Sequence, residues 1–224
     1  AVHHLEDFAF SPEECRALAA GMRATMEKGL RGEPSDLRML PSYVTHMPGG
    51  GEEGVFYALD LGGTNFRVIR VSLSPGGHSE VRFNKFALSK DLITGQGDAL
   101  FLFLAECIRD TIRDMGDDPS PADPHRLGFT FSFPCEQTAV NKGSLVWWTK
   151  GFTCPGVEGQ EVVALLQAAL ARPEVGVSVV VEALVNDTVG TLMAAKRGDP
   201  RCVMGIIFGT GTNACYVEQV SQIQ

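Results

Sequence analysis

Asp60-Leu61-Gly62-Gly63-Thr64-Asn65-Phe66-Arg67 stands between two apolar runs, Val55 to Leu59 before it and Phe66 to Leu73 after it. Two strand-like runs that meet at a Gly-Gly pair predict a tight β-hairpin, because glycine tolerates the positive φ values that such turns use. An ordinary hairpin with a polar tip has the same pattern, so the turn alone does not establish a function.

The residues of this turn have the chemistry of an anion site. Glycine has no side chain, so backbone N–H groups can come close to a bound anion, and Thr64 and Asn65 add further donors. Asp60 ends the first strand, where its carboxylate could face a cation carried by the anion. The turn therefore predicts a phosphate group with a divalent metal as its ligand.

The composition fits a globular protein of one large or two small domains. The chain has 224 residues, of which 44% are hydrophobic and 21% charged, and its formal net charge is −8. Lys and Arg do not cluster, which argues against a nucleic-acid or anionic membrane surface, and no apolar run has the length of a membrane span. Six scattered cysteines without a CxxC pair or secretory signal predict free thiols in a reducing compartment, hence the cytoplasm, although a lost N-terminal targeting or anchor segment stays open.

The periodicity of apolar residues predicts a mixed α/β chain. Expected helices cover residues 12–28, 99–115, 160–171 and 188–197, and expected strands cover 55–59, 66–73, 82–88, 127–133, 177–185, 202–208 and 214–220, with an irregular hairpin at 135–150. Ser11 to Glu14 has the pattern of a capping box, and Asp98 is the expected cap of the second helix. The run 177–185 is apolar enough for a strand buried on both faces. This order predicts a mixed sheet that begins with a meander and continues through helical crossovers.

Gly211-Thr212-Asn213 repeats Gly63-Thr64-Asn65 between two later strands, which indicates an internal duplication. Two such hairpins facing each other could bind one polyphosphate from both sides. Residues 209–214 also spell GxGxxA, the start of a dinucleotide-binding motif, but that motif needs a following helix and Cys-Tyr-Val favours a strand.

Asn186-Asp187 lies where a buried strand gives way to a helix, the position at which open α/β sheets bind their ligands. The simpler interpretation is that Asp187 only caps the helix. Capping is compatible with a second role as a catalytic base. A helix N-terminus favours an ionised carboxylate, and phosphoryl transfer requires little of its base because the transition state is loose.

Five segments in the order of the chain resemble the eukaryotic hexokinases; they are 59–67, 127–134, 148–152, 185–190 and 208–216. Residues 39–43 and 56–58 are most similar to the plant and algal branch. The resemblance implies an α/β, actin-like ATPase (ribonuclease H-like) fold with a complete small lobe and the start of the large lobe. It also implies ATP-dependent phosphorylation of a hexose (glucose, mannose or fructose) at its 6-hydroxyl group, with Mg²⁺. The alternative is a hexokinase-like protein that senses sugar without turnover.

The resemblance assigns roles to individual residues. Asp187 is similar to the base that takes the proton of the sugar hydroxyl, Lys150 to a group that neutralises the transferred phosphoryl, and Asp60 to the carboxylate near Mg²⁺, usually through water. The implied sugar-pocket positions are Ser132, Phe133, Thr149, Lys150, Asn186, Asp187 and Asn213. The implied ATP-phosphate positions are Asp60, Gly62, Gly63, Thr64 and Asn65 in the first hairpin and Thr210 in the second.

The family pattern also predicts how the chain is organised. Residues 1–50 are expected to form a helix and linker that pack with the large lobe, residues 51–185 the small lobe, and residues 186–224 the beginning of the large lobe. Family members continue well beyond this length, so we expect an N-terminal half that is inactive, or nearly so, by itself. The sequence does not distinguish the preferred hexose and does not indicate an oligomeric state.

Overall fold

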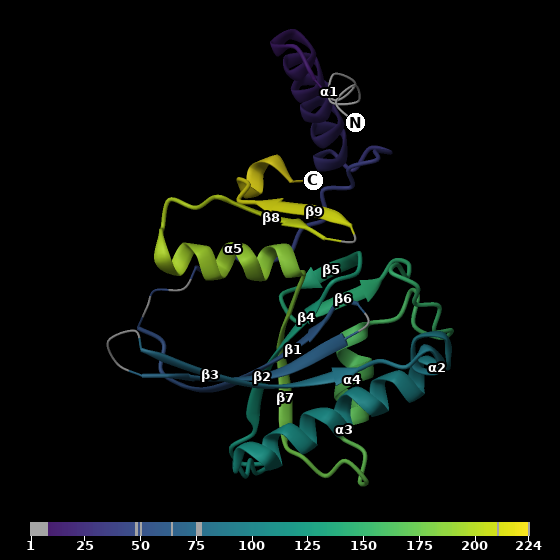
Figure 1. The fold of residues 1–224 in the computed structure, drawn as a ribbon, viewed down its shortest axis with the longest axis vertical. Coiled ribbons are helices and arrows are strands. Elements are labelled where there is room, and N and C mark those ends of the chain that lie inside the picture. Colours follow the sequence, from purple (N-terminus) through teal and green to yellow (C-terminus); the bar gives the residue numbers. More distant parts are fainter. Residues whose placement is uncertain are drawn as a thin grey trace, which may run out of the picture. The chain divides into compact units, whose positions relative to one another are not determined.

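The structure is a computed structural model that describes residues 9–47, 49, 51–63, 65–74, 78–209 and 211–223, with only the backbone of Asn65 (Figure 1). These residues divide into two units, one within 1–41 and 218–224 and the other within 42–217. The division does not test the lobe boundary expected at residue 185. Within the described residues, no helix has both the length and the apolar character needed to cross a membrane.

The first unit contains the helix α1 (Pro12–Leu30) and the short 3-10 helix η2 (Val220–Gln222). The predicted capping box is confirmed, because Ser11 Oγ accepts from the Glu14 backbone N–H at 3.2 Å and Glu14 Oε2 accepts from the Ser11 N–H at 2.8 Å. Leu18 and Met22, which recur at helical spacing, are more than half exposed. The apolar stripe of α1 is therefore exposed to solvent at Leu18 and Met22.

The second unit is built on a five-stranded sheet in the order β3-β2-β1-β4-β7. Its strands are β1 (Gly54–Leu61), β2 (Asn65–Leu73), β3 (Ser79–Ala87), β4 (His125–Phe131) and β7 (Val179–Val185). The first three pair antiparallel as a meander, whereas β4 pairs parallel with β1 and β7 pairs parallel with β4. The mixed sheet with crossovers that the sequence predicts is confirmed.

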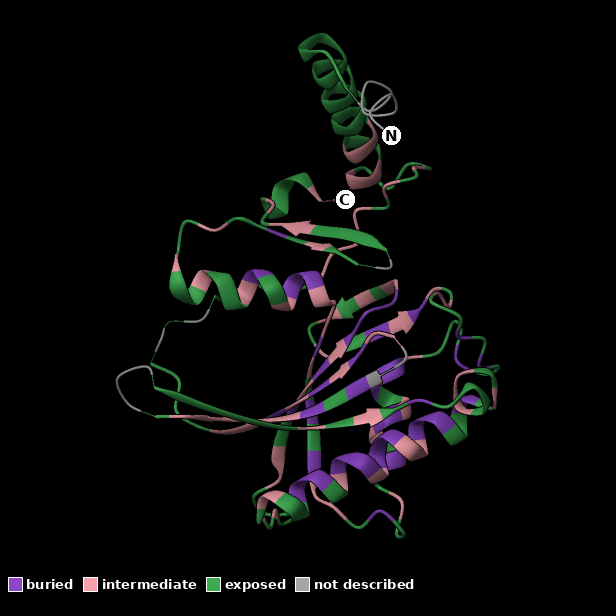
Figure 2. Cartoon of the chain, in the orientation of Figure 1, coloured by how far each residue is buried: buried purple, intermediate pink, exposed green. Residues whose placement is uncertain are grey.

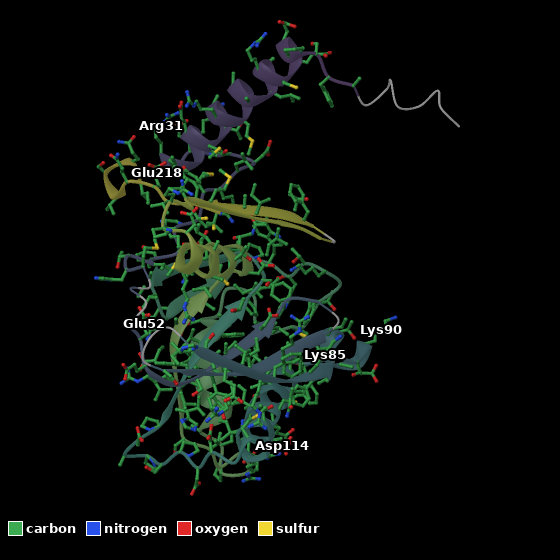
Figure 3. The ribbon with its side chains drawn as sticks, turned by 60° about the vertical axis from the view of Figure 1, so that its left-hand side comes forward. Arg31, Glu52, Lys85, Lys90, Asp114 and Glu218 are labelled. Carbon is green, nitrogen blue, oxygen red and sulfur yellow. The ribbon has the colours of Figure 1, made fainter. Side chains whose placement is uncertain are left out.

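One face of this sheet is covered by α3 (Gly97–Met115) and α4 (Val162–Leu170). The buried residues concentrate between this face and the two helices (Figure 2). Leu104 and Ile108 of α3 and Leu59 of β1 are fully buried there. At the end of α3, Asn84 of β3 donates to Asp114 Oδ2 at 3.0 Å; Figure 3 labels Asp114 at the periphery of the unit. The core therefore gives β1 and β4 a rigid support, and their carboxyl ends carry the site residues.

The other elements of this unit lie outside the five-stranded sheet and the two helices that cover it. The remaining elements are α2 (Lys90–Thr94), the hairpin of β5 (Cys135–Ala139) and β6 (Lys142–Leu145), α5 (Asp187–Gly198), and the hairpin of β8 (Met204–Phe208) and β9 (Thr212–Tyr216). The α5 helix packs directly on β8, because a Cβ atom on Gly205 would lie 2.5 Å from the Thr188 carbonyl oxygen. Only glycine allows this close approach, which ties the β8–β9 hairpin to the start of α5.

Several predictions about the ends and faces of elements are wrong. The α3 helix begins at Gly97 and its N-cap is Gln96, so Asp98 lies in the first turn and pairs with Arg172 instead of capping. The β7 strand is an edge strand, and alternate residues such as Val180 are exposed, so it is not buried on both faces. The third strand begins at Ser79 instead of residue 82, and the last strand ends at Tyr216 instead of residue 220.

Candidate active site

The β1–β2 hairpin places Asp60 opposite Arg67 in the antiparallel register. Arg67 Nη1 lies 3.6 Å from Asp60 Oδ2, and both side chains are partly exposed. Burial raises the pKa of the Asp60 carboxyl, the charge of Asp187 adds to this rise, and Arg67 and Lys150 act against it. The pKa of Asp60 thus depends on charged side chains from β2, α5 and the loop after β6.

Gly62 follows β1 and lies against Ser132, the residue after β4. A Cβ atom on Gly62 would be 3.1 Å from Ser132 Oγ and 3.8 Å from Lys150 Nζ. Neither Gly62 nor Gly63 has the positive φ that the sequence argument gives as the reason for glycine. That reason is therefore wrong, and the close approach to Ser132 explains glycine at position 62. Thr64, the side chain of Asn65 and Thr210 lie outside the described residues.

Lys150 bridges the loop after β6 to the end of β4. Its Nζ donates to the Ser132 carbonyl oxygen at 3.0 Å and lies 5.6 Å from the centre of the Phe133 ring. Its φ is 56°, a left-handed conformation that is costly for a residue with a side chain. Thr149 stands directly before it, and its carbonyl oxygen accepts from the Phe152 N–H at 3.0 Å. A strained backbone at a chain-bridging lysine is consistent with a functional position.

The ring of Phe133 packs in an aromatic cluster. It is buried, and its centroid lies 4.8 Å from Phe131, 4.9 Å from Trp148 and 4.9 Å from Phe152. Trp148 is fixed further, because its Nε1 donates to the Cys154 carbonyl oxygen at 2.8 Å. The cluster supports the chain on both sides of the site, so at Phe133 the backbone is the part that a sugar could contact.

Asn186 and Asp187 stand at the junction of β7 and α5. Asn186 is the N-cap and Asp187 is the first residue of the helix, so the expectation that Asp187 caps it is wrong. Asn186 caps instead because its Oδ1 accepts from the Thr188 N–H at 3.1 Å, while Asp187 Oδ1 accepts from the same N–H at 2.9 Å. Both side chains are partly exposed at the positive end of the α5 dipole, which suits a carboxylate.

The second glycine hairpin is connected to this junction. Asn213 of β9 donates through Nδ2 to Asn186 Oδ1 at 3.0 Å. The residues after the GxGxxA pattern form β9, a strand, where a dinucleotide motif would require a helix. The structure therefore excludes the dinucleotide-binding alternative for residues 209–214.

Sequence reasoning missed two residues of this site. Arg67 is the register partner of Asp60, whereas a two-residue turn at Gly62-Gly63 would have placed Asn65 there, so the predicted hairpin gave no signal for Arg67. Thr188 is buried and hydrogen-bonds Asn186 through both its N–H and its hydroxyl group. A threonine two residues after an Asn cap is the available signal, because short polar side chains at such spacings bond locally.

The donor set at Asp60 fits Mg²⁺ bound together with a phosphate. Among the described residues, no three His, Cys, Asp or Glu side chains form a group that could hold a metal ion. Mg²⁺ does not need such a group, since it keeps several waters and binds through one or two carboxylates and substrate phosphates. Burial and, after it, the charge of Asp187 raise the pKa of Asp60, and a divalent cation beside it would favour the ionised carboxylate.

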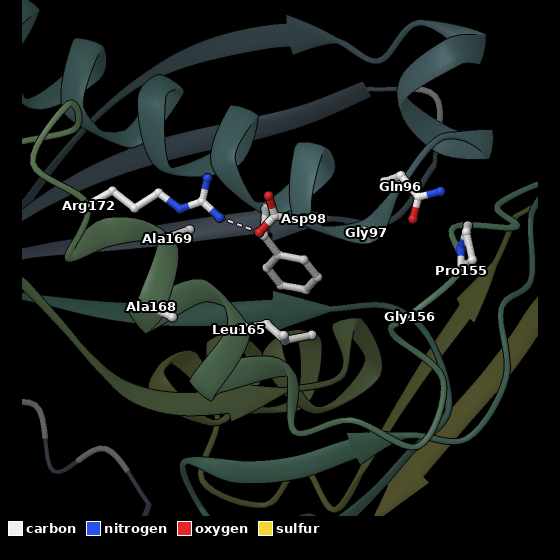
Figure 4. Close-up of a pocket in the computed structure, with 10 residues that line it drawn as sticks. Gln96, Gly97, Asp98, Pro155, Gly156, Leu165, Ala168, Ala169 and Arg172 are labelled. Atoms are coloured by element: carbon white, nitrogen blue, oxygen red, sulfur yellow. Dashed lines mark hydrogen bonds and ion pairs between the residues drawn. The ribbon is translucent and has the colours of Figure 1, made fainter.

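A separate hollow of about 200 Å³ lies between the start of α3, α4 and the loop at Pro155 (Figure 4). Asp98 and Arg172 form an ion pair at its side, and Leu165 contributes to its wall. None of the residues that line it belongs to the predicted site. The hollow therefore does not bear on the predicted site.

Comparisons with known proteins agree on one family. A hexokinase family model matches residues 2–197, and a second hexokinase model matches residues 203–224. The chain is 46% identical to rat hexokinase-3 over 219 residues, which cover 98% of this chain and 23% of that protein. It is 43% identical to the hexokinase of Schistosoma mansoni over 213 residues, which cover 95% of this chain and 46% of that protein.

Solved structures give the same result. The structure of Schistosoma mansoni hexokinase complexed with glucose matches with a TM-score of 0.89 at 41% identity, over 100% of this chain and 50% of that one. A second crystal structure of a hexokinase matches with a TM-score of 0.78 at 37% identity, over 93% of this chain and 50% of that one. These matches confirm the predicted actin-like, α/β fold class. The chain spans about half the length of these structures and less than half the length of the curated relatives.

Proposed function

The chain belongs to the hexokinase family, and from this premise we propose that its full-length polypeptide transfers a phosphoryl group from ATP to the 6-hydroxyl group of a hexose. The product is a hexose 6-phosphate, which would enter glycolysis in the cytoplasm. The observation that carries this proposal is the contact of Gly62 with Ser132 and Lys150, because it brings the proposed phosphate hairpin directly against the proposed sugar pocket. The matched structure with bound glucose makes glucose the first hexose to test, before mannose and fructose.

In this proposal, Asp187 accepts the proton of the sugar 6-hydroxyl group. The α5 N-terminus supports its negative charge, and its bond from the Thr188 N–H at 2.9 Å fixes one carboxylate oxygen. The other carboxylate oxygen can then face the substrate. A weak base is sufficient, because the hydroxyl proton can leave late in a loose transition state.

Lys150 is proposed to act on the transferred phosphoryl group. Its Nζ stands beside Gly62 and Ser132, where the first phosphate hairpin meets the proposed sugar pocket. There the ammonium group would neutralise charge on the transferred phosphoryl group. Asp60 would hold Mg²⁺ through water, and Mg²⁺ would neutralise charge on the phosphates of ATP.

The other proposed contacts follow from position. The Gly62-Gly63 backbone, together with Thr64 and Asn65, is proposed to bind the ATP phosphates from one side, and Thr210 of the second hairpin from the other. Ser132, Phe133, Thr149, Asn186 and Asn213 are proposed to surround the sugar. Of these, Ser132 is held by its N–H, which donates to the Leu61 carbonyl oxygen at 3.0 Å.

A coupled assay of hexose 6-phosphate formation by the full-length polypeptide tests the proposal. Asp187→Asn should lower kcat by about 10²- to 10⁴-fold, because it removes the base without changing the shape of the side chain. Asp199→Asn is the matched control, since Asp199 caps the other end of α5 and pairs with Arg201. Glucose binding without turnover by the wild-type polypeptide would favour the sugar-sensing alternative.

A further inference from the structure

The side-chain oxygen of Asn186 accepts three hydrogen bonds. Its donors are the Thr188 N–H at 3.1 Å, the Thr188 hydroxyl group at 2.8 Å and Asn213 Nδ2 at 3.0 Å. The Thr188 N–H is shared with Asp187 Oδ1 at 2.9 Å, and the other two donors match the two lone pairs of an amide oxygen, so no accepting capacity remains for a ligand. Among the described residues, Asn186 Nδ2 has no partner.

These bonds also fix which end of each amide faces which neighbour. A backbone N–H can only donate, so the atom of Asn186 that faces the Thr188 N–H must be the oxygen. Asn213 is fixed in the same way, because its Oδ1 accepts from the Ala214 N–H at 2.9 Å and its Nδ2 therefore faces Asn186. Neither amide can rotate by half a turn without losing these bonds.

We infer that Thr188 and Asn213 are positioning residues that make Asn186 a pure hydrogen-bond donor toward the substrate. This inference rests on the proposed function. Asp187, the next residue, offers only accepting oxygens when it is ionised. The two neighbours thus form a donor–acceptor pair, in which Asn186 requires one sugar oxygen that accepts a hydrogen bond.

The inference gives Thr188 a role although its side chain is buried. Its hydroxyl group acts through Asn186, and the same threonine anchors the start of α5. The inference also links the β8–β9 hairpin to substrate recognition, because Asn213 on β9 hydrogen-bonds the side-chain amide of Asn186, which would face the sugar. Movement of the hairpin would then be transmitted to sugar binding.

Fluorinated and deoxygenated sugars test this orientation in the full-length polypeptide. A C–F group accepts a hydrogen bond weakly and donates none, whereas a deoxy position does neither. For the sugar position that faces Asn186, the wild-type polypeptide should bind the deoxyfluoro-glucose roughly two- to tenfold more tightly than the corresponding deoxyglucose. Dissociation constants for both sugars at each ring position identify that position.

The variants separate positioning from folding. Thr188→Val and Asn213→Leu each remove one donor to Asn186, so the fluoro-over-deoxy preference should fall, and it should fall furthest in the double variant, which leaves only the Thr188 N–H on Asn186 Oδ1. Thr188→Ser keeps the hydroxyl group and should restore the preference. Asn213 is exposed, so Asn213→Leu supplies the readout if Thr188→Val does not fold.

The outcomes distinguish this inference from the proposed function. Turnover of glucose without a fluoro-over-deoxy preference at any position, or with one that the variants leave unchanged, overturns the inference alone. Sugar binding with the expected preference but without turnover overturns the proposed function and leaves the donor role of Asn186 in place. A wild-type polypeptide that binds no hexose overturns both.

Discussion

Gly62 and Ser132 lie so close together that a Cβ atom on Gly62 would be 3.1 Å from Ser132 Oγ and 3.2 Å from Ser132 Cβ. The β1–β2 hairpin and the end of β4 therefore touch without an intervening side chain. The Ser132 N–H also donates to the carbonyl oxygen of Leu61, the residue before Gly62, at 3.0 Å. This double contact holds the proposed phosphate and sugar segments in one fixed arrangement.

Gly62→Ala should destabilise the fold and impair catalysis. The added methyl group forces the hairpin or Ser132 to move by a few tenths of an ångström, and overpacking of this kind costs about 1 kcal/mol or more. Urea unfolding should show this loss, and kcat/KM for the hexose should fall with it. For stability, Gly63→Ala is the matched control, because no described residue outside its chain neighbours lies within 4 Å of its added Cβ and its φ is not positive. Equal stability losses in the two variants would contradict the contact.

Lys150→Gly should be more stable than Lys150→Ala by about 1 kcal/mol, because only glycine relieves the left-handed φ of 56°. Both substitutions remove the Nζ bond to the Ser132 carbonyl oxygen, so that loss is the same in each. If the ammonium group acts on the phosphoryl group, both variants should lower kcat to a similar extent, because both lack that group. Thermal unfolding and steady-state kinetics measure the two effects separately. A more stable alanine variant would show that the strain at position 150 is absent in solution.

The sequence predicts those parts of this fold that depend on near neighbours along the chain. Ser11 and Glu14 are three residues apart, so their reciprocal cap follows from local chemistry. The β1–β2 hairpin likewise follows from two apolar runs around the Gly-Gly pair. The roles assigned to Asp187 and Lys150 come from the resemblance to a family, and they stay predictions.

The remaining features depend on contacts between distant segments. Val180 is exposed whereas Val179 and Val181 beside it are buried, so only one face of β7 is covered, and no local pattern determines which faces other elements cover. The need for glycine at position 62 comes from Ser132, 70 residues away along the chain. The cap at Asn186 depends in part on Asn213, which reaches it from another hairpin. Such tertiary contacts decide which local conformation forms where the local sequence is compatible with more than one.

Asp60→Asn should stabilise the fold at neutral pH while lowering activity. Burial raises the pKa of Asp60 above its ordinary value of about 3.9, so the unfolded chain loses this proton first as the pH rises. Stability therefore falls between the two pKa values, and the full penalty applies above the native one. Asparagine removes the penalty, and the lost Arg67 pair is partly exposed and worth at most about 1 kcal/mol.

Urea unfolding of wild type and Asp60→Asn from pH 3 to pH 7 measures this effect. The advantage of the variant should be present at pH 7 and shrink as the pH falls through the raised native pKa. Coupled assays at pH 7 should show lower kcat/KM, because the proposed Mg²⁺ carboxylate is gone. A variant that is less stable than wild type at pH 7 would mean that Arg67 and Lys150 outweigh the burial of Asp60.

Asp117→Asn should destabilise the sheet at the end away from the proposed site. Asp117 accepts from Arg70 Nε at 2.7 Å and from the Tyr57 hydroxyl group at 2.7 Å, and its side chain is only 18% exposed. Hydrogen bonds to charged groups of this kind contribute about 1.5–3 kcal/mol, so we expect a loss in that range at pH 7.

The pH dependence of this loss has a definite sign. The bond from Arg70 and, after it, the bond from Tyr57 lower the pKa of Asp117, so its contribution is complete above the ordinary pKa of about 3.9. Protonation removes the contribution as the pH falls through the lowered native pKa, and the difference between wild type and variant should therefore narrow in acid. Urea unfolding from pH 7 to pH 2.5 tests this, with Asp118→Asn at the exposed neighbouring carboxylate as the control. A difference that stays constant over this range would mean that packing around residue 117, and not its charge, accounts for the loss.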